Sequence, residues 1–284
     1  MNIFKKILNR IERTLNTHQA YKFFIKDWIE LNDLKLCSQI VSTMRFFKKI
    51  DPLEMSVPKA NKIIIIAPHT DDEILGPGGT LIKCLMLNKS VTVIYLSSGK
   101  PIVQNNKDAK EISRKLGFNS VFLDFPLGDF PITEDSISII AQEINKVHPK
   151  AIFLPFLFDD HDDHRRASEL IFNVSKVHQK LFSNIEIWGY QVYTSLPLNV
   201  VVDITDVVDK KEELIRLYRA QAKVRDWANY SIGLNAYNSR FLKTGSKKSF
   251  AENFFVVPWH EYKKICSIYF QNPSSCYYNK NYLK

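Results

Sequence analysis

The chain has 284 residues, of which 45% are hydrophobic and 24% charged, a composition typical of a soluble globular protein and not of a disordered one. No apolar run approaches the roughly 20 residues of a membrane-spanning helix, and the N-terminus lacks the apolar core of a secretory signal, so we expect a cytoplasmic protein. Its four cysteines include no CxxC pair and are expected to be reduced, with Cys84 in the core, so a metal site would use nitrogen and oxygen ligands.

The positive charge is concentrated at the N-terminus. The chain carries a net charge of +9, and residues 1–50 contain ten Lys or Arg against four Asp or Glu. Apolar residues recur there at the helical period, which predicts helices over residues 2–49 and a basic amphipathic extension over residues 1–58. Its apolar face is expected to pack on the rest of the protein, with peripheral contact to the inner face of a membrane as the alternative. No nucleic-acid-binding motif is present, so we expect no nucleic-acid partner.

Short apolar segments alternate with amphipathic segments after Pro58. The predicted strands are 63–67, 91–96, 121–124, 151–156, 185–190 and 200–204, and the predicted helices 76–88, 108–116, 136–147, 163–177 and 206–224. This alternation predicts an α/β fold, a Rossmann-like and mostly parallel sheet flanked by helices. Beyond residue 224 no clear periodicity is visible, and that part is predicted to be rich in loops. The main domain would cover residues 59–284, with its core at about 59–257.

Two polar clusters follow two of the predicted strands. His69 and Asp72 come after the first strand, and His161 and His164 follow the strand at 151–156 in the segment FDDHDDHRR. Parallel strands end at the same edge of a sheet, where ligands gather, so we expect these groups to converge. Two imidazoles and a carboxylate suit a zinc ion that keeps one position open for water and lowers its pKa to about 7. Asp71, beside these ligands, would then act as a general base.

Each cluster also has a purely structural interpretation. The acids Asp71, Asp72 and Glu73 would favour a helix N-terminus through its dipole, and the acids around His161 would cap the next helix. Two histidines and a carboxylate also describe iron oxygenases, although a parallel α/β pattern does not match their β-barrel. The loop GPGG lacks both nucleotide-binding patterns, GxGxxG and GxxxxGK[ST], and predicts a tight strand-to-helix turn. The two clusters together, at the ends of two buried strands, favour metal chemistry.

The motifs APHTDDE (67–73) and HDDH (161–164), with GPGGT between them, resemble those of the PIG-L/LmbE-like de-N-acetylase family, AHPDDE and HxDH. The resemblance covers roughly residues 60–257 and departs where Thr70 replaces the family's proline. The segments GLNAY (233–237) and SFAENF (249–254) are similar to family segments near the substrate. The resemblance implies a role for each motif residue: metal ligands His69, Asp72 and His164; general base Asp71; oxyanion stabiliser or proton donor His161; and Asp163 to orient His161.

The resemblance also implies an activity. We expect a zinc-dependent hydrolase, with Fe²⁺ as the alternative metal, that removes acetyl from an N-acetylated amino sugar of the N-acetylglucosaminyl type and releases acetate and a free amine. The basic N-terminus adds the expectation of a lipid- or nucleotide-linked sugar as substrate. The alternatives are a hydrolase of another amide, a non-haem iron enzyme that uses the same residues, and a catalytically silent binding protein.

Overall fold

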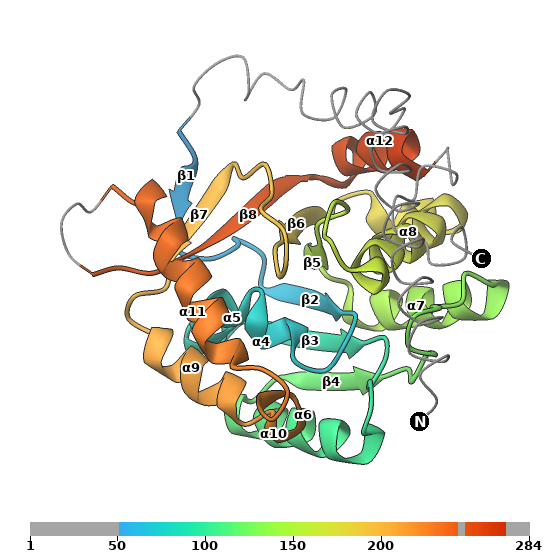
Figure 1. Ribbon diagram of the computed structural model, residues 1–284. Helices are drawn as coiled ribbons and strands as arrows, with labels where there is room; N and C mark the ends of the chain where they lie inside the picture. The colour runs from blue at the N-terminus through green and yellow to red at the C-terminus, as the bar shows by residue number, and fades with distance from the viewer. Residues whose placement is uncertain (1–50, 244–247, 271–284) are drawn as a thin grey trace, which may run out of the picture.

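A single sheet organises the computed structural model, which describes residues 51–243 and 248–270. Its eight strands lie in the order β1-β7-β8-β6-β5-β2-β3-β4 (Figure 1). Their bounds are β1 Leu53–Met55, β2 Lys62–Ala67, β3 Ser90–Tyr95, β4 Asn119–Phe122, β5 Ala151–Pro155, β6 Glu186–Tyr190, β7 Val200–Asp203 and β8 Ala251–Pro258. All neighbouring pairs of described strands are parallel except the two that involve β8. The predicted α/β fold is therefore confirmed.

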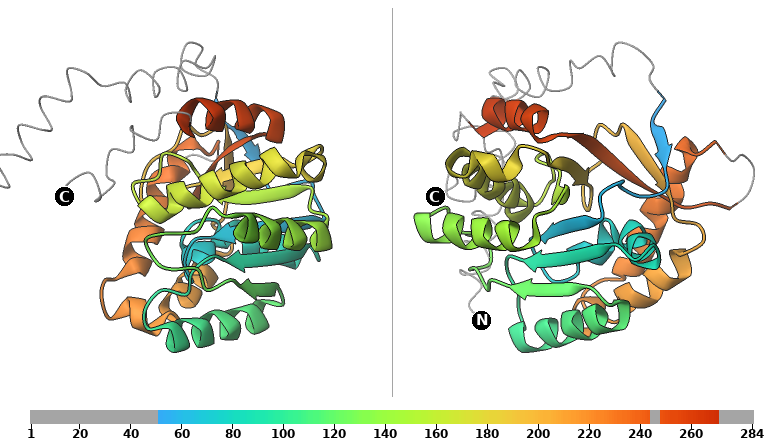
Figure 2. Two further views of the ribbon diagram at one scale, coloured as in Figure 1. Left: turned by 90° about the vertical axis from the view of Figure 1, so that its right-hand side faces the viewer. Right: turned by 180° about the vertical axis from the view of Figure 1, so that it is seen from behind.

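Helices cover both faces of the sheet, as Figure 2 shows. One face packs against α5 (Gly78–Met86), α6 (Ile102–Leu116), α9 (Val208–Arg216) and α11 (Trp227–Asn238). The other face packs against α7 (Glu134–Val147), α8 (Asp162–Val177) and α12 (Trp259–Phe270). The isoleucines of β2, at positions 63–66, are at most 1% exposed, because a central parallel strand is covered on both sides. This burial explains why the strand is apolar along its whole length.

The C-terminal part differs most from the prediction. The predicted helix at 206–224 is two helices, α9 and the short α10 (Arg219–Ala222). The segment predicted to be loop-rich contains α11, β8 and α12, so that prediction is wrong. The reason is visible in α11, which turns Ser231, Asn235 and Asn238 inward while Tyr230 and Tyr237 are exposed. A helix whose buried side is polar produces no apolar period in the sequence.

The sheet begins before Pro58, within the range predicted as the extension. The residues of β1 pair in parallel register with β7, with Leu53 opposite Val200. The helices predicted over residues 2–49 lie outside the described residues. None of the helices in the described part of the chain combines the length and the apolar character of a membrane span.

Candidate metal and catalytic site

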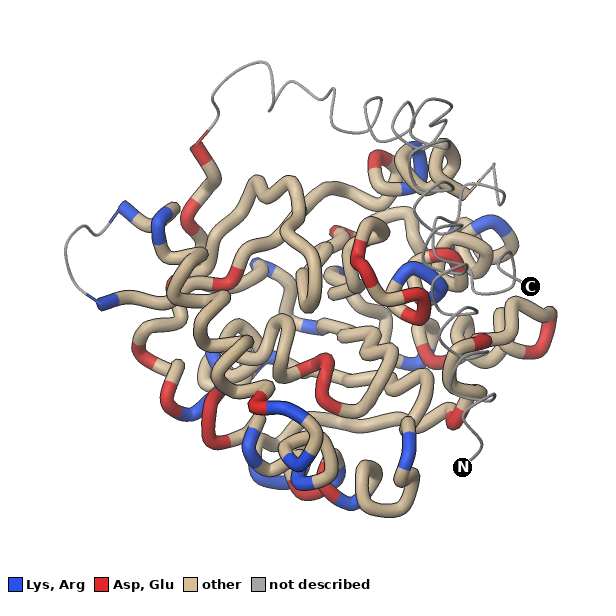
Figure 3. Tube along the Cα trace, in the orientation of Figure 1, with Lys and Arg blue, Asp and Glu red and all other residues tan. Residues whose placement is uncertain are grey.

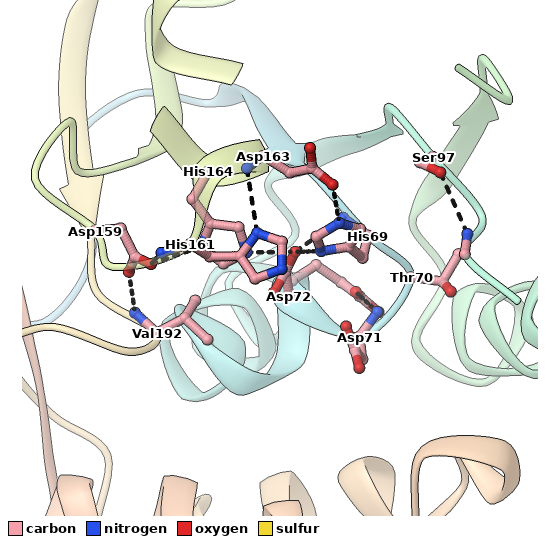
Figure 4. A network of polar contacts seen from close by, with 12 residues as sticks. His69, Thr70, Asp71, Asp72, Ser97, Asp159, His161, Asp163, His164 and Val192 are labelled. Carbon is pink, nitrogen blue, oxygen red and sulfur yellow. Dashed lines mark hydrogen bonds and ion pairs between the residues drawn. The ribbon is translucent and has the colours of Figure 1, made fainter. Parts of the chain in front are cut away.

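The two predicted clusters meet at one edge of the sheet (Figure 4). His69 lies between β2 and the short helix α4 (Asp72–Leu75), which begins with Asp72, and His164 lies in the first turn of α8, which follows β5. Because β2 and β5 are parallel neighbours, their carboxyl ends bring these side chains together. One ligand atom from each of His69, Asp72 and His164 falls within 4.8 Å of the others. The predicted convergence is therefore present in the fold.

Asp72 occupies the centre of this group. Its Oδ2 accepts a hydrogen bond from the backbone N–H of His69 at 2.8 Å. The same oxygen lies 3.2 Å from His69 Nδ1 and 3.2 Å from His164 Nε2. Burial opposes ionisation of Asp72, but the two imidazoles hold its pKa well below its usual range. An ionised carboxylate between two imidazoles is a donor set that suits a divalent cation.

His164 supports this fit independently. Its ring is fully buried, and neither ring nitrogen makes a hydrogen bond of acceptable geometry within the described residues. Carboxylate oxygens nevertheless lie nearby, with Asp159 Oδ1 3.2 Å from Nδ1. Burial lowers the pKa of His164, but the charges of Asp72 and Asp159 outweigh burial and raise it to about 9. A cation would bind a ring nitrogen of His164 that otherwise makes no hydrogen bond, so the residues present fit a metal ion.

Asp71 has an unusual backbone conformation beside this group. Its φ is 132° and its ψ is −27°, in a region that residues with a side chain rarely adopt. The conformation is held because its carbonyl accepts hydrogen bonds from the N–H groups of Ile74 and Leu75, while its own N–H donates to Glu73 Oε2. Burial and the charge of Asp72 raise the pKa of Asp71 well above its ordinary value. Backbone strain and a perturbed carboxyl at one residue are typical of a functional position.

His161 is held as a neutral donor. It is the N-cap of α8, and its Nδ1 accepts a hydrogen bond from the backbone N–H of Asp163 at 3.1 Å. The proton of the neutral ring must then reside on Nε2. Burial and the positive charges of His164 and His69 lower the pKa of His161, which favours the neutral form.

The position of Asp163 differs from the prediction. From the resemblance we expected the Asp163 carboxylate to orient the ring of His161. In the structure, Asp163 Oδ2 instead lies 2.9 Å from His69 Nε2 and accepts a hydrogen bond from Gly128 N at 3.0 Å. It is the backbone of Asp163, not its side chain, that orients His161. His69, His161 and Asp163 form a second donor group within the same 4.8 Å limit. The first group is the better candidate, since Asp72 and His164 are both buried and His164 lacks hydrogen bonds.

Several residues near the site were not predicted as functional. Asp159 lies beside His164, and its carboxylate also accepts hydrogen bonds from the backbone N–H groups of His161 and Tyr193. The ring of Tyr193 stacks on that of His161, with centroids 5.6 Å apart. In the sequence, only its place among the acids just before the second motif pointed to Asp159. Tyr193 lies in a loop whose sequence shows no pattern.

The GPGG segment connects the helices α4 and α5, and not a strand directly to a helix as predicted, because the short α4 lies between β2 and this segment. The backbone N–H groups of Gly79 and Thr80, at the start of α5, donate to the two carboxylate oxygens of Glu252 at 2.7 and 2.8 Å. A helix N-terminus attracts an anion, and here the chain supplies that anion from β8. Glu252 lies in the segment SFAENF, and Asn235, in GLNAY, donates to the carbonyl of Ala251 beside it. Glu252 therefore fixes the start of α5, and Asn235 fixes the strand that carries Glu252.

Comparisons with known proteins agree with this arrangement. The family model described as PIG-L: GlcNAc-PI de-N-acetylase matches residues 64–175. A diacetylchitobiose deacetylase of Thermococcus kodakarensis is 27% identical over 227 residues, which are 69% of this chain and 83% of the relative. The structure of an N,N'-diacetylchitobiose deacetylase from Pyrococcus horikoshii is similar, with a TM-score of 0.60 at 21% identity over 72% of this chain and 86% of that one.

The fold is also shared with a protein of different chemistry. The structure of GalB, a 4-carboxy-2-hydroxymuconate hydratase from Pseudomonas putida, superposes with a TM-score of 0.59 at 17% identity, covering 72% of this chain and 96% of that one. At such identities the two structural likenesses establish the fold, and an activity must be argued from the site.

Proposed function

We propose that the chain is a metal-dependent N-deacetylase of an N-acetylated amino sugar and a member of the PIG-L/LmbE-like de-N-acetylase family, whose model matches residues 64–175. It would release acetate and a free amine. The observation that carries the proposal is the convergence of His69, Asp72 and His164 at one sheet edge, with Asp71 and His161 beside them. A silent binding protein would not need this combination of donors, base and acid.

In this proposal His69, Asp72 and His164 hold the metal, which we expect to be Zn²⁺, with Fe²⁺ as the alternative. A bound cation of this kind acts as a Lewis acid and makes water more acidic. Nitrogen and oxygen donors that are already gathered and buried need little rearrangement to bind it.

Asp71 would carry the proton transfers, and His161 would stabilise the charge that develops on the acetyl group. The Asp71 carboxylate accepts a proton from the attacking water, and its raised pKa makes it a stronger base than an ordinary aspartate. The neutral His161 ring donates a hydrogen bond from Nε2 to the acetyl oxygen as negative charge develops there. When the C–N bond breaks, the nitrogen receives the proton that Asp71 took from the water. One water is consumed, and acetate and an amine are formed.

The finer expectations about the substrate stay predictions. A lipid- or nucleotide-linked sugar and peripheral membrane contact both depend on residues 1–50, which lie outside the described part of the chain. Two of the similar proteins named above are diacetylchitobiose deacetylases, which makes short N-acetylglucosamine saccharides the first substrates to test.

The test is release of acetate and amine from N-acetylglucosamine, its methyl glycoside and diacetylchitobiose by protein loaded with Zn²⁺ or Fe²⁺. Asp71→Asn is expected to bind metal like the parent and to lose at least about a hundredfold in turnover, since it lacks the base. Asp160→Asn is the matched control, because Asp160 is an exposed acid close to the second motif. Absence of release from every N-acetyl sugar, with one equivalent of metal bound, would overturn the proposal.

A further inference from the structure

A cavity of about 220 Å³ opens beside Asp71, between α4 and the segment that contains the end of α9, α10 and the start of α11. Asp71 and Leu75 form one side, and residues between Ile215 and Ala228 form the other. Drug-sized ligands occupy sites of roughly 300–1,000 Å³, so this smaller cavity suits a single ring with a small substituent. Its contact with Asp71 places such a ring next to the candidate catalytic carboxylate.

An aromatic wall joins this cavity to the candidate site. Trp227 lines the cavity and meets Tyr193 edge-on, with ring centroids 5.7 Å apart. Tyr193 in turn stacks on His161. The face of a sugar ring carries C–H groups that pack well on an aromatic ring. Trp227 and Tyr193 lie outside the range matched by the family model, so this wall is contributed by another part of the chain.

The cavity is lined by two arginines with different surroundings. Arg216 is paired with Glu212 at 2.7 Å and approaches Asp226 at 3.5 Å. Asp226 is further engaged as the N-cap of α11, where it accepts a hydrogen bond from Asn229 N. The charges of Arg216 and of its two acids are therefore already used within the protein.

Arg225 has no such partner. Its guanidinium lies 6.0 Å from the centroid of the Trp227 ring, and no carboxylate of the described residues is within ion-pair distance. Its charge nevertheless reaches the site, because it opposes the rise in the pKa of Tyr193 that burial and the nearby aspartates cause. Figure 3 shows Lys and Arg residues interspersed with Asp and Glu residues around α6 and α10. A free guanidinium presents a fork of donors that matches a carboxylate or a phosphate.

We propose that this cavity binds the amino sugar of the substrate, with the ring against Trp227 and an anionic substituent, phosphate or carboxylate, on Arg225. The inference rests on the proposed function for the chemistry at Asp71. Charge also sets the direction of binding, because Arg225 attracts the anionic end of the sugar. The acetamido group is thereby directed to Asp71. The substrate class is an N-acetylated amino sugar that carries negative charge.

The experiment compares a neutral substrate, methyl N-acetylglucosaminide, with N-acetylglucosamine 1-phosphate and with N-acetylmuramic acid, which carries a carboxylate. Arg225→Gln is expected to raise the KM for the charged substrate at least about tenfold, since hydrogen bonds to charged groups are lost. The kcat/KM for the neutral substrate should fall by much less, because this substrate has no group for the guanidinium to bind. A larger KM in Arg225→Gln for N-acetylglucosamine 1-phosphate would indicate that Arg225 binds a phosphate, and a larger KM for N-acetylmuramic acid would indicate that it binds a carboxylate.

Arg240→Gln is the matched control. Arg240 also lies over an aromatic ring, 3.7 Å from the centroid of Tyr237, but it does not line the cavity. Its variant should behave like the parent with all three substrates. An equal loss for charged and neutral substrates in Arg225→Gln, or no preference of the parent for either charged sugar, would overturn the proposal.

Binding of the same sugars by calorimetry separates this inference from the proposed function. Binding of a charged sugar that needs Arg225, without acetate release, would support the cavity and refute the deacetylase. Acetate release from neutral and charged sugars alike, with no effect of Arg225→Gln, would keep the deacetylase and refute the assignment of the cavity.

Discussion

Lys211 and Glu252 form a buried ion pair beside the GPGG segment, with Lys211 Nζ 2.8 Å from Glu252 Oε1 and the two side chains 0% and 2% exposed. Lys211 also donates to the carbonyl groups of Leu75 and Gly76, at the end of α4. Burial lowers the pKa of Lys211, and the charge of Glu252 opposes this effect. Because Glu252 binds the first turn of α5, the pair joins the two helices on either side of the GPGG connection.

Removal of one partner from this pair should destabilise the protein strongly. Lys211→Met leaves the Glu252 carboxylate buried without its cation, and we expect the free energy of unfolding to fall by about 3–5 kcal/mol. Urea denaturation measures the loss. Lys210→Met is the control, since Lys210 is exposed and pairs with the exposed Glu213, and its effect should stay within about 0.5 kcal/mol. Equal stability of the two variants would show that the pair does not hold this region together.

Asp159 should tune the metal site without binding the metal. Its carboxylate lies beside His164 Nδ1, so it can fix the ring and leave Nε2 to the cation. Asp159→Asn is expected to weaken Zn²⁺ binding about 10- to 100-fold in competition with a chelating dye. Asp160→Asn, at the exposed neighbouring position, should bind Zn²⁺ like the parent. Unchanged affinity in Asp159→Asn would remove Asp159 from the metal site.

The backbone conformation of Asp71 predicts an inverted order of stability for two substitutions. At a φ of 132°, a residue with a side chain is strained by about 1–3 kcal/mol, whereas glycine adopts this conformation without strain. In the presence of a chelator, we therefore expect Asp71→Gly to be more stable than Asp71→Ala by about 1 kcal/mol in thermal or urea unfolding. At Gln142, an exposed position within α7, the order should reverse, because glycine is the poorer helix former. A more stable alanine at both positions would show that Asp71 is not strained.

The buried thiol of Cys84 predicts a loss of stability at alkaline pH. Burial raises the pKa of Cys84 to about 12 from an ordinary value near 9. Between these values the folded chain keeps a proton that the unfolded chain releases, so the contribution of this group is complete below pH 9 and declines above it. The parent should lose up to about 1 kcal/mol relative to Cys84→Ala between pH 9 and pH 10. A difference between parent and variant that is the same at both pH values would contradict the assignment.

The predictable part of the molecule is the part in which burial follows a simple period. The isoleucines of β2 and the apolar run of β5 are buried on both faces. The two strands, and the polar clusters that follow them, could therefore be identified from these apolar runs in the sequence. The convergence of His69, Asp72 and His164 then follows from the parallel pairing of the two strands. Cys84 was expected in the core and is buried there.

The part of the molecule that the sequence does not predict is held by contacts between segments that are separated in the sequence. Asn235 and Glu252 are buried polar residues whose partners lie far away in the sequence, and a local pattern does not reveal such partners. The carboxylate of Asp163 contacts His69, whereas the backbone N–H of Asp163 donates to the ring of His161. Motif spacing specifies which residues meet but not which atom of each residue makes the contact.

The antiparallel strand β8 has a consequence for the order in which the chain can fold. In the sheet it separates β7 from β6, so β7 and its neighbour β1 are connected to the remaining strands through residues 251–258. The strands β2, β3 and β4 can pair as soon as they leave the ribosome, because their partners are close in the sequence. The residues of β1, although synthesised earlier, must wait until β8 has emerged about 200 residues later. During synthesis, the earliest strand of the sheet is thus among the last to be incorporated.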